Sequence, residues 1–302
     1  MKVMRRLLKF LIWLCLLPLV LAGVVSVLLY IPPVQDMVVR IASSYVGEAT
    51  GMKIGIERIR LKFPIDLSVE GVEILSANTP NDTILLLDEL TVSIRPRPLL
   101  DKEVLIDGVD LSGVRVDTGE LLEGITVKGA LGQLHLHADR ISLDNERAVF
   151  NEIRLKDTAI TVLLRSTPED TTASEPSQWE LILQKISLEN VALACQMPED
   201  SLRIATYIKN SWLSDGEINL GKELYHAVEF GIEGSELWYD ANYAAPVDGL
   251  DVEHLALSDI DLKMSALMYA GKDIGATLEN FSFRERSGLE VNSLVGLFQS
   301  DE

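Results

Sequence analysis

An eight-residue pattern of hydrophobic and polar positions recurs six times along the chain. Each copy reads aliphatic, any residue, aliphatic, two residues without an aliphatic side chain, and then aliphatic, any residue, aliphatic. Alternation with a period of two is typical of a β-strand that has one apolar face. The pattern therefore predicts six strands of related construction, and the copies begin at Ile54, Leu67, Leu85, Val104, Ile186 and Leu255.

The two central residues of each copy decide how the strand continues. One extra residue turns the second half of a strand to the opposite face, whereas a β-bulge absorbs it, restores the face and bends the strand. The alternative is a two-residue hairpin turn, for which Asp107-Gly108 and Glu189-Asn190 have suitable chemistry. However, hairpin arms of three residues are too short to be stable, and Glu57 and Asp88 suit positions with φ > 0 poorly. We therefore interpret the central pairs as bulges in a curved sheet with one apolar face.

Strand-like runs continue from residue 52 almost to the end of the chain, and no segment there repeats the helical period over three turns. We expect about fifteen to eighteen strands, which at about 4.8 Å each give an elongated sheet roughly 70–90 Å long. Ser166–Gln178 has prolines and little apolar content, so it is expected to be an exposed loop. It marks no domain boundary, because the same pattern occurs on both sides. Besides the copies above, the runs are Ile65–Leu75, Ile84–Ile94, Val104–Val116, Ile125–Val127, Leu134–Leu143, Ile153–Leu164, Trp179–Ala194, Leu202–Ile208, Ile218–Leu220, Val228–Ile232, Leu237–Tyr239, Leu255–Met264 and Phe281–Val291.

The first 31 residues are expected to form a membrane anchor. No charged residue occurs from Phe10 to Gln35, and the apolar core at 7–31 is long enough to span a bilayer. A cleaved signal peptide is the alternative, but the apolar character continues past any suitable cleavage site. Basic residues before the segment and Asp36 after it place the N-terminus in the cytoplasm. In a bacterium this means a single-pass inner-membrane protein with a periplasmic body, and the anchor candidates are Leu7, Phe10, Trp13, Leu21, Val27 and Tyr30.

A short amphipathic helix is expected at 32–51, before the periplasmic region at 52–302. Apolar residues recur at helical spacing from Val34 to Tyr45, two prolines precede them, and Gly51 supplies a C-terminal stop. This helix either packs against the first strands or lies on the bilayer. Its polar face carries Arg40 as its one base, which favours packing.

The charge of the chain limits its partners. The net charge is −19, and the first 31 residues carry four basic and no acidic side chains, so the remainder carries −23. Such a surface repels phosphate, which argues against nucleic-acid binding and against electrostatic binding to anionic lipid. The chain has two cysteines, Cys15 inside the anchor and Cys195 beyond it, so the exported part is expected to contain no disulfide.

The sequence offers little catalytic chemistry. His135 and His137 lie two residues apart, so they share a strand face and could bind a metal with Asp139. A solvated strand face is the favoured interpretation of these residues. The nucleotide-binding, hydrolase and metalloprotease motifs are absent. We therefore expect no enzyme activity, no catalytic or metal-binding residue and no cofactor.

Three segments, taken in order after the anchor, resemble the N-terminal region of the TamB branch of the AsmA-like proteins. They are "IGIERIRLKFPIDLSVEGVEI" (54–74), "LLDKEVLIDGVDLSGVRV" (99–116) and "ENFSFRERSGLEV" (279–291). The resemblance implies a mainly β protein with an N-terminal transmembrane helix, a short amphipathic helix and an elongated, curved β-sheet that forms a U-shaped, β-taco-like groove. It also implies that phospholipid acyl chains move along this groove toward the outer membrane.

The resemblance leaves other functions open. Scaffolding or chaperoning of outer-membrane protein assembly is one alternative, and a structural spacer is another. An Omp85-type outer-membrane partner would bind through a C-terminal region that has no counterpart here, so we expect the groove to continue beyond residue 302. The residues expected to line the groove are Ile54, Ile56, Ile59, Leu61, Leu67, Val69, Val72, Ile74, Val104, Ile106, Val109 and Leu111.

Overall fold

The structure is a computed structural model that describes residues 52–62, 66–76, 82–95, 106–142, 146–165, 177–271 and 273–300. The anchor and the amphipathic helix expected at 1–51 lie outside these residues. Within the described part, no helix has the length and apolar character needed to cross a membrane.

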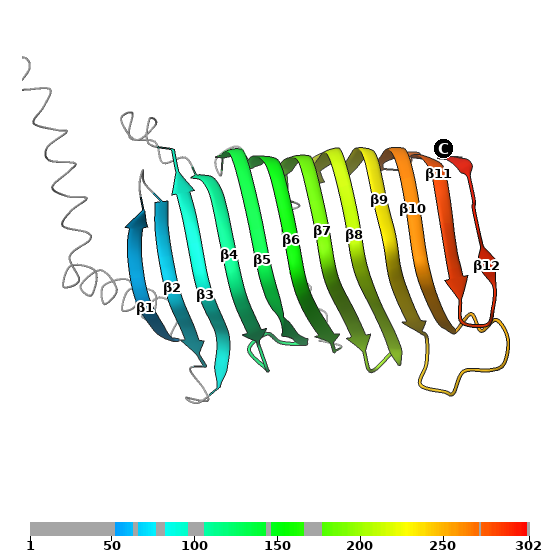
Figure 1. The fold of residues 1–302 in the computed structure, drawn as a ribbon, viewed down its shortest axis with the longest axis horizontal. Helices are drawn as coiled ribbons and strands as arrows, with labels where there is room; N and C mark the ends of the chain where they lie inside the picture. The colour runs from blue at the N-terminus through cyan, green and yellow to red at the C-terminus, as the bar shows by residue number, and fades with distance from the viewer. Residues whose placement is uncertain are drawn as a thin grey trace, which may run out of the picture.

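One open, curved sheet of thirteen strands makes up the described part of the protein (Figure 1). The strands follow one another in sequence order from β1 to β12, and β13 pairs with β11 beside β12. Neighbours are antiparallel except β6 and β7, which are parallel. The strands are β1 (Lys53–Lys62), β2 (Asp66–Leu75), β3 (Thr83–Ile94), β4 (Ile106–Asp117), β5 (Ile125–Ser142), β6 (Arg147–Leu164), β7 (Glu180–Met197), β8 (Leu202–Asn219), β9 (Leu224–Asp240), β10 (His254–Ala270), β11 (Asp273–Glu285), β12 (Glu290–Val291) and β13 (Gly296–Ser300).

The mainly β, curved character of the sheet is confirmed, but the expected number of strands was too high. β5, β8 and β9 each join two runs that the sequence separates. Polar or glycine-containing stretches, such as the one at 128–133, interrupt the apolar alternation there while the backbone pairing continues. The strand order from β1 to β12 has eleven steps, which at about 4.8 Å each cover roughly 50 Å. The expected length of 70–90 Å was therefore also too large.

A line of bulges crosses the sheet at the central pairs of the sequence pattern. Between β3 and β4 the pairing skips Asp88 and Gly113 together, and between β6 and β7 it skips Asp157 and Asn190. We call this the central bulge line. Each strand passes through it without a turn, so the hairpin interpretation is wrong. The pairing skips one residue on both strands and keeps its register, so these irregularities are matched in neighbouring strands, whereas a β-bulge would insert its extra residue in one strand only. The members of the central bulge line from β1 to β10 are Glu57, Gly71, Asp88, Gly113, Gly132, Asp157, Asn190, Lys209, Gly234 and Asp259.

A second bulge line crosses the sheet nearer the other strand ends. The pairing of β3 with β4 skips Asp107, that of β7 with β8 skips Gln184 and Asp215, and that of β9 with β10 skips Val228 and Ala266. The copy of the pattern that begins at Val104 therefore belongs to this second line. The two lines divide the longer strands into three segments, and each line bends them (Figure 1).

Backbone conformation explains which residues occupy the central bulge line. Gly113 has φ +63°, Asp157 +50° and Asn190 +55°. Glycine, aspartate and asparagine tolerate this left-handed region best. Glu57 and Asp88 do not have positive φ, and each is opposite a glycine that does.

Replacement of Gly113 tests this arrangement. An added Cβ would lie 1.9 Å from Asp88 Oδ2, on a residue that already has φ +63°. We expect Gly113→Ala to lower the free energy of unfolding by about 2 kcal/mol, as measured by urea denaturation. Gly119→Ala is the matched control, because its φ is +51° and nothing lies within 4 Å of the new Cβ. It should cost about 1 kcal/mol, and equal losses in the two variants would contradict a role for the Asp88 contact.

The sheet is a single layer in the part of the chain that the structure describes. Substantial contacts occur between strands that are neighbours in the sheet. No second sheet or helix among the described residues packs on either face. Stability therefore comes from backbone pairing and from contacts between side chains of adjacent strands.

Candidate functional site

One face of the sheet carries long rows of mainly apolar side chains. Residues that pair across strands place their side chains on the same face, so the register defines each row. We call this the apolar face. One of its rows crosses the eleven strands β1 to β11, and another crosses the ten strands β2 to β11. The first is Ile59, Val69, Leu90, Leu111, Leu134, Leu155, Leu188, Ser211, Ile232, Leu262 and Phe281, and the second is Leu67, Val92, Val109, Leu136, Ile153, Ile186, Leu213, Phe230, Met264 and Leu278.

The expected groove residues fall on this face. Ile54, Ile56 and Ile59 of β1 pair with Ile74, Val72 and Val69 of β2. Val69 continues through β3 to Leu111 of β4 and Leu67 continues to Val109, while Ile106 pairs with Ile94. Leu61 pairs with Leu67, and Val104 lies outside the described residues. The bulges thus bring the two halves of each pattern copy to one face.

The expected set was too short, because the apolar face continues through β5 to β11. Sequence reasoning missed residues such as Leu134 and Leu155, and it left Leu188 out of the expected groove although Leu188 belongs to the copy that begins at Ile186. The pattern is incomplete in β5, β6 and β8, where Gly129, Thr158 and Ser211 occupy positions of the apolar rows. The alternation on either side of those small residues was the available signal.

Exposure varies across the apolar face. Val191 is 0% exposed and Leu87 is 8% exposed, and both lie beside the central bulge line. Leu67 and Leu193, farther from that line, are 37% and 39% exposed. Leu183 and Ala227, beside the second bulge line, are 7% and 4% exposed. Close shielding therefore occurs beside both bulge lines, while side chains such as Leu67 and Leu193 are more open to their surroundings.

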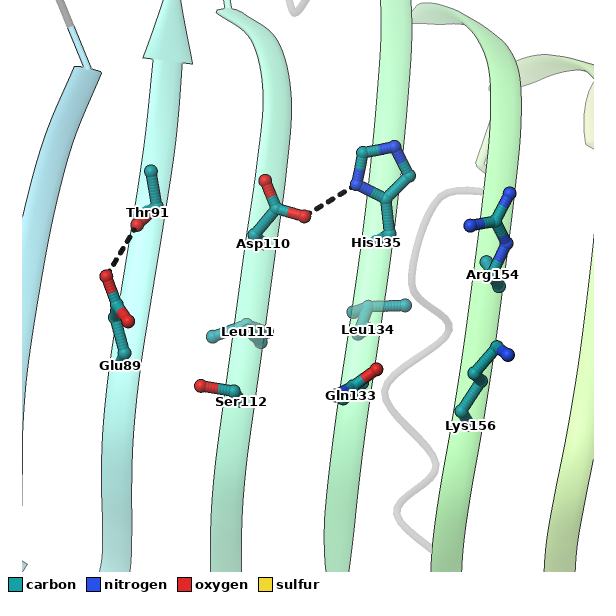
Figure 2. A pocket seen from close by; sticks show the side chains of 10 residues that line it. All are labelled: Glu89, Thr91, Asp110, Leu111, Ser112, Gln133, Leu134, His135, Arg154 and Lys156. Carbon is teal, nitrogen blue, oxygen red and sulfur yellow. Dashed lines mark hydrogen bonds and ion pairs between the residues drawn. The ribbon is translucent and has the colours of Figure 1, made fainter. Parts of the chain in front are cut away.

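The opposite face is mainly polar over β3 to β6, whereas over β6 to β9 it also carries alanines, Tyr207 and Trp238. Figure 2 shows polar side chains from β3 to β6 around a shallow depression of about 580 Å³. Asp110 Oδ1 lies 2.6 Å from His135 Nδ1, and Lys156 forms an ion pair with Glu189. Exposed pairs of this kind contribute little stability each, but they cover the face with balanced charge.

The metal site considered for His135, His137 and Asp139 does not form. His135 faces Asp110, and Asp139 accepts a 3.2 Å hydrogen bond from Arg95. Among the described residues, no group of three or more His, Cys, Asp or Glu side chains could hold a metal ion.

No known protein family matches this chain, and no curated protein is similar to it. Its function is therefore inferred from its own residues.

The connection from β9 to β10, residues 241–253, has an ordered interior. We call it the β9–β10 loop. The Asp251 side chain accepts hydrogen bonds from the backbone N–H groups of Val247 (2.9 Å) and Glu253 (3.1 Å). His254 is 5% exposed, and its ring nitrogens lie 3.1 Å from Asp240 Oδ1 and from Asn242 Oδ1. These contacts fix the loop on the ends of its two strands.

Acid should loosen this loop. The Val247 N–H, and then that of Glu253, lower the pKa of Asp251. Because this pKa is lower in the folded state than in the unfolded state, the stabilisation is present above the unfolded pKa and is lost as pH falls through the folded pKa. We expect hydrogen exchange in 241–253, corrected for its intrinsic pH dependence, to rise below about pH 4. Asp251→Asn should remove that pH dependence, and an unchanged profile in this variant would contradict the assignment.

Proposed function

We propose that this protein is an inner-membrane-anchored conduit for phospholipid acyl chains, related to the TamB branch of the AsmA-like proteins. In this proposal residues 1–31 hold the chain in the bacterial inner membrane, and the curved sheet forms a U-shaped groove in the periplasm. Acyl chains lie on the apolar face and head groups stay in water. Movement is toward the outer membrane, and no nucleic acid, cofactor or catalytic residue takes part.

The extended, mainly apolar face of a single-layer sheet supports this proposal most directly. An ordinary sheet protein covers such a face with a second layer, and the described residues supply none. Two bulge lines bend the strands, and well-shielded aliphatic side chains, such as Val191 and Leu183, lie beside them. Both features fit a trough whose inside is the apolar face.

The energetics favour such a route. A sixteen-carbon acyl chain in water exposes surface worth about 0.8 kcal/mol per CH₂ group, or roughly 13 kcal/mol. Rows of Leu, Ile and Val remove most of this cost. Because successive rows are chemically alike, a chain that slides from strand to strand meets sites of similar free energy and needs no catalytic group.

Photo-crosslinking in cells tests the proposal. We expect phospholipid adducts from a photoreactive residue at Val69, Leu111 or Leu257, which lie on the apolar face of β2, β4 and β10. Ser112 is the matched control, because it neighbours Leu111 in β4 and lies on the polar face. Absence of adducts at all three apolar positions, or equal adducts at Ser112, would contradict the proposal.

A scaffold for outer-membrane protein assembly is the second candidate. Among the described residues, β13 pairs with β11 on one side only, and its Leu297 is 71% exposed. Such an edge can add a strand from another polypeptide. Crosslinks from β13 to polypeptide, together with an absence of lipid adducts on the apolar face, would favour this function.

A further inference from the structure

The most exposed hydrophobic side chains belong to the last part of the chain, in the β9–β10 loop and, at the other end of β11, in and beside β13. Seven large hydrophobic side chains in the described part are more than half exposed, and all of them follow β9 in the chain. Four belong to the β9–β10 loop, which lies beyond the ends of the last long strands (Figure 1). The seven are Tyr243, Val247, Leu250, Val252, Val295, Leu297 and Phe298. An exposed group of this kind marks a binding surface.

The scaffold of the loop holds these side chains outward in a fixed arrangement. Besides the contacts of Asp251 and His254, Ala241 N donates to Glu253 O at 2.8 Å. The turn after β11 is held to the start of β10, because Arg286 Nη2 donates to His254 O at 3.2 Å. A surface that is ordered before it binds loses less entropy on binding.

The charges of the loop select an uncharged apolar partner. Residues 241–253 contain no Lys or Arg. Two of the three carboxylates, Asp251 and Glu253, accept hydrogen bonds inside the loop. The outward surface is therefore mainly aliphatic with one tyrosine, and the net charge of −19 disfavours an anionic membrane.

We propose that the β9–β10 loop binds the surface of a zwitterionic lipid bilayer. This inference rests on the proposed function and names a second membrane as its partner. Tyr243 suits the interface, where its ring is buried and its hydroxyl stays wet. Val247, Leu250 and Val252 enter the boundary between head groups and acyl chains. The last apolar pair before the loop, Tyr239 with Leu255, joins this contact to the apolar face.

Vesicle capture tests the inference with the full chain. The chain is incorporated into phosphatidylcholine vesicles and mixed with labelled, protein-free phosphatidylcholine vesicles, and capture is measured by co-flotation. We expect capture by the wild type and an approximately tenfold loss in the double variant Val247→Asp, Leu250→Asp, since 1.4 kcal/mol corresponds to a factor of ten. Both side chains are exposed, so circular dichroism should show an unchanged fold.

Leu122→Asp is the matched control, because Leu122 is 47% exposed in the connection between β4 and β5. Capture that stays at the wild-type level in this control supports the loop assignment. Equal loss in the control, no capture by the wild type, or capture confined to anionic vesicles would overturn it. Lipid adducts at Val69 report separately on the groove, so capture without adducts would reject the proposed function alone, and adducts without capture would reject the membrane contact alone.

Discussion

Leu134→Asp is expected to reduce phospholipid adducts at Leu257 by about tenfold or more, while the protein remains folded. Leu134 lies in β5 and pairs with Leu111 and Leu155 in the row that crosses β1 to β11. An acyl chain that passes a carboxylate there must displace its water, which costs several kcal/mol. A cost of 1.4 kcal/mol is enough for a tenfold fall in passage. Because Leu134 is only half-buried, its loss should cost about 1–3 kcal/mol of stability.

Gln133→Asp is the matched control for this variant. Gln133 is the preceding residue in β5, is exposed, and pairs with Ser112 and Lys156 on the polar face. The same charge placed there should leave adduct formation unchanged, and Lys156 should accommodate it. Equal reduction by both variants would show that charge anywhere on β5 disturbs the protein, and the apolar face would lose its assigned role.

The sequence predicted the face of the sheet well because strand alternation is a local property. Spacing of two marks the apolar side, and the polar central pair marks the place where a bulge restores it. Glu57 with Arg58 and Asp88 with Glu89 are poor turn residues, which separated bulges from hairpins. The structure confirms that these pairs are not turns, and it shows that a glycine on the neighbouring strand takes the left-handed conformation while the register is kept.

Long-range pairing was harder to predict. The residues of β6 and β7 do not indicate that the two strands pair in parallel. Their direction and register depend on the path of the chain between them. The second bulge line was missed for a different reason. Residues as unlike as Asp107, Val228 and Ala266 occupy it, so no shared side-chain chemistry marks its position.

The number of strands was overestimated for a related reason. Lys209 and Gly234 lie in polar stretches that end the apolar alternation, but each is a member of the central bulge line inside one continuous strand. Backbone hydrogen bonds do not depend on side-chain polarity, so the ladder continues where the hydrophobic pattern stops. Interruptions at regular places were therefore evidence of a bend in the strands.

Val191→Asp is expected to lower the free energy of unfolding by about 3–5 kcal/mol, the largest stability effect among these predictions. Val191 is 0% exposed and directly follows Asn190, the residue of β7 with φ +55° on the central bulge line. Its cross-strand partners are Thr158, itself 2% exposed, and Ile208. A carboxylate there would lose its water without a charged partner in the pairing. Urea denaturation would measure the change.

Leu193→Asp supplies the comparison, because Leu193 lies two residues along β7 on the same face and is 39% exposed. Its carboxylate keeps part of its hydration, so the expected loss is about 1 kcal/mol. Burial raises the pKa of a carboxyl group, so the defect of Val191→Asp should shrink as pH falls and the group becomes neutral. Similar losses for the two variants, or a defect of Val191→Asp that does not change with pH, would contradict a sheet that is shielded along its bulge lines and more open beyond them.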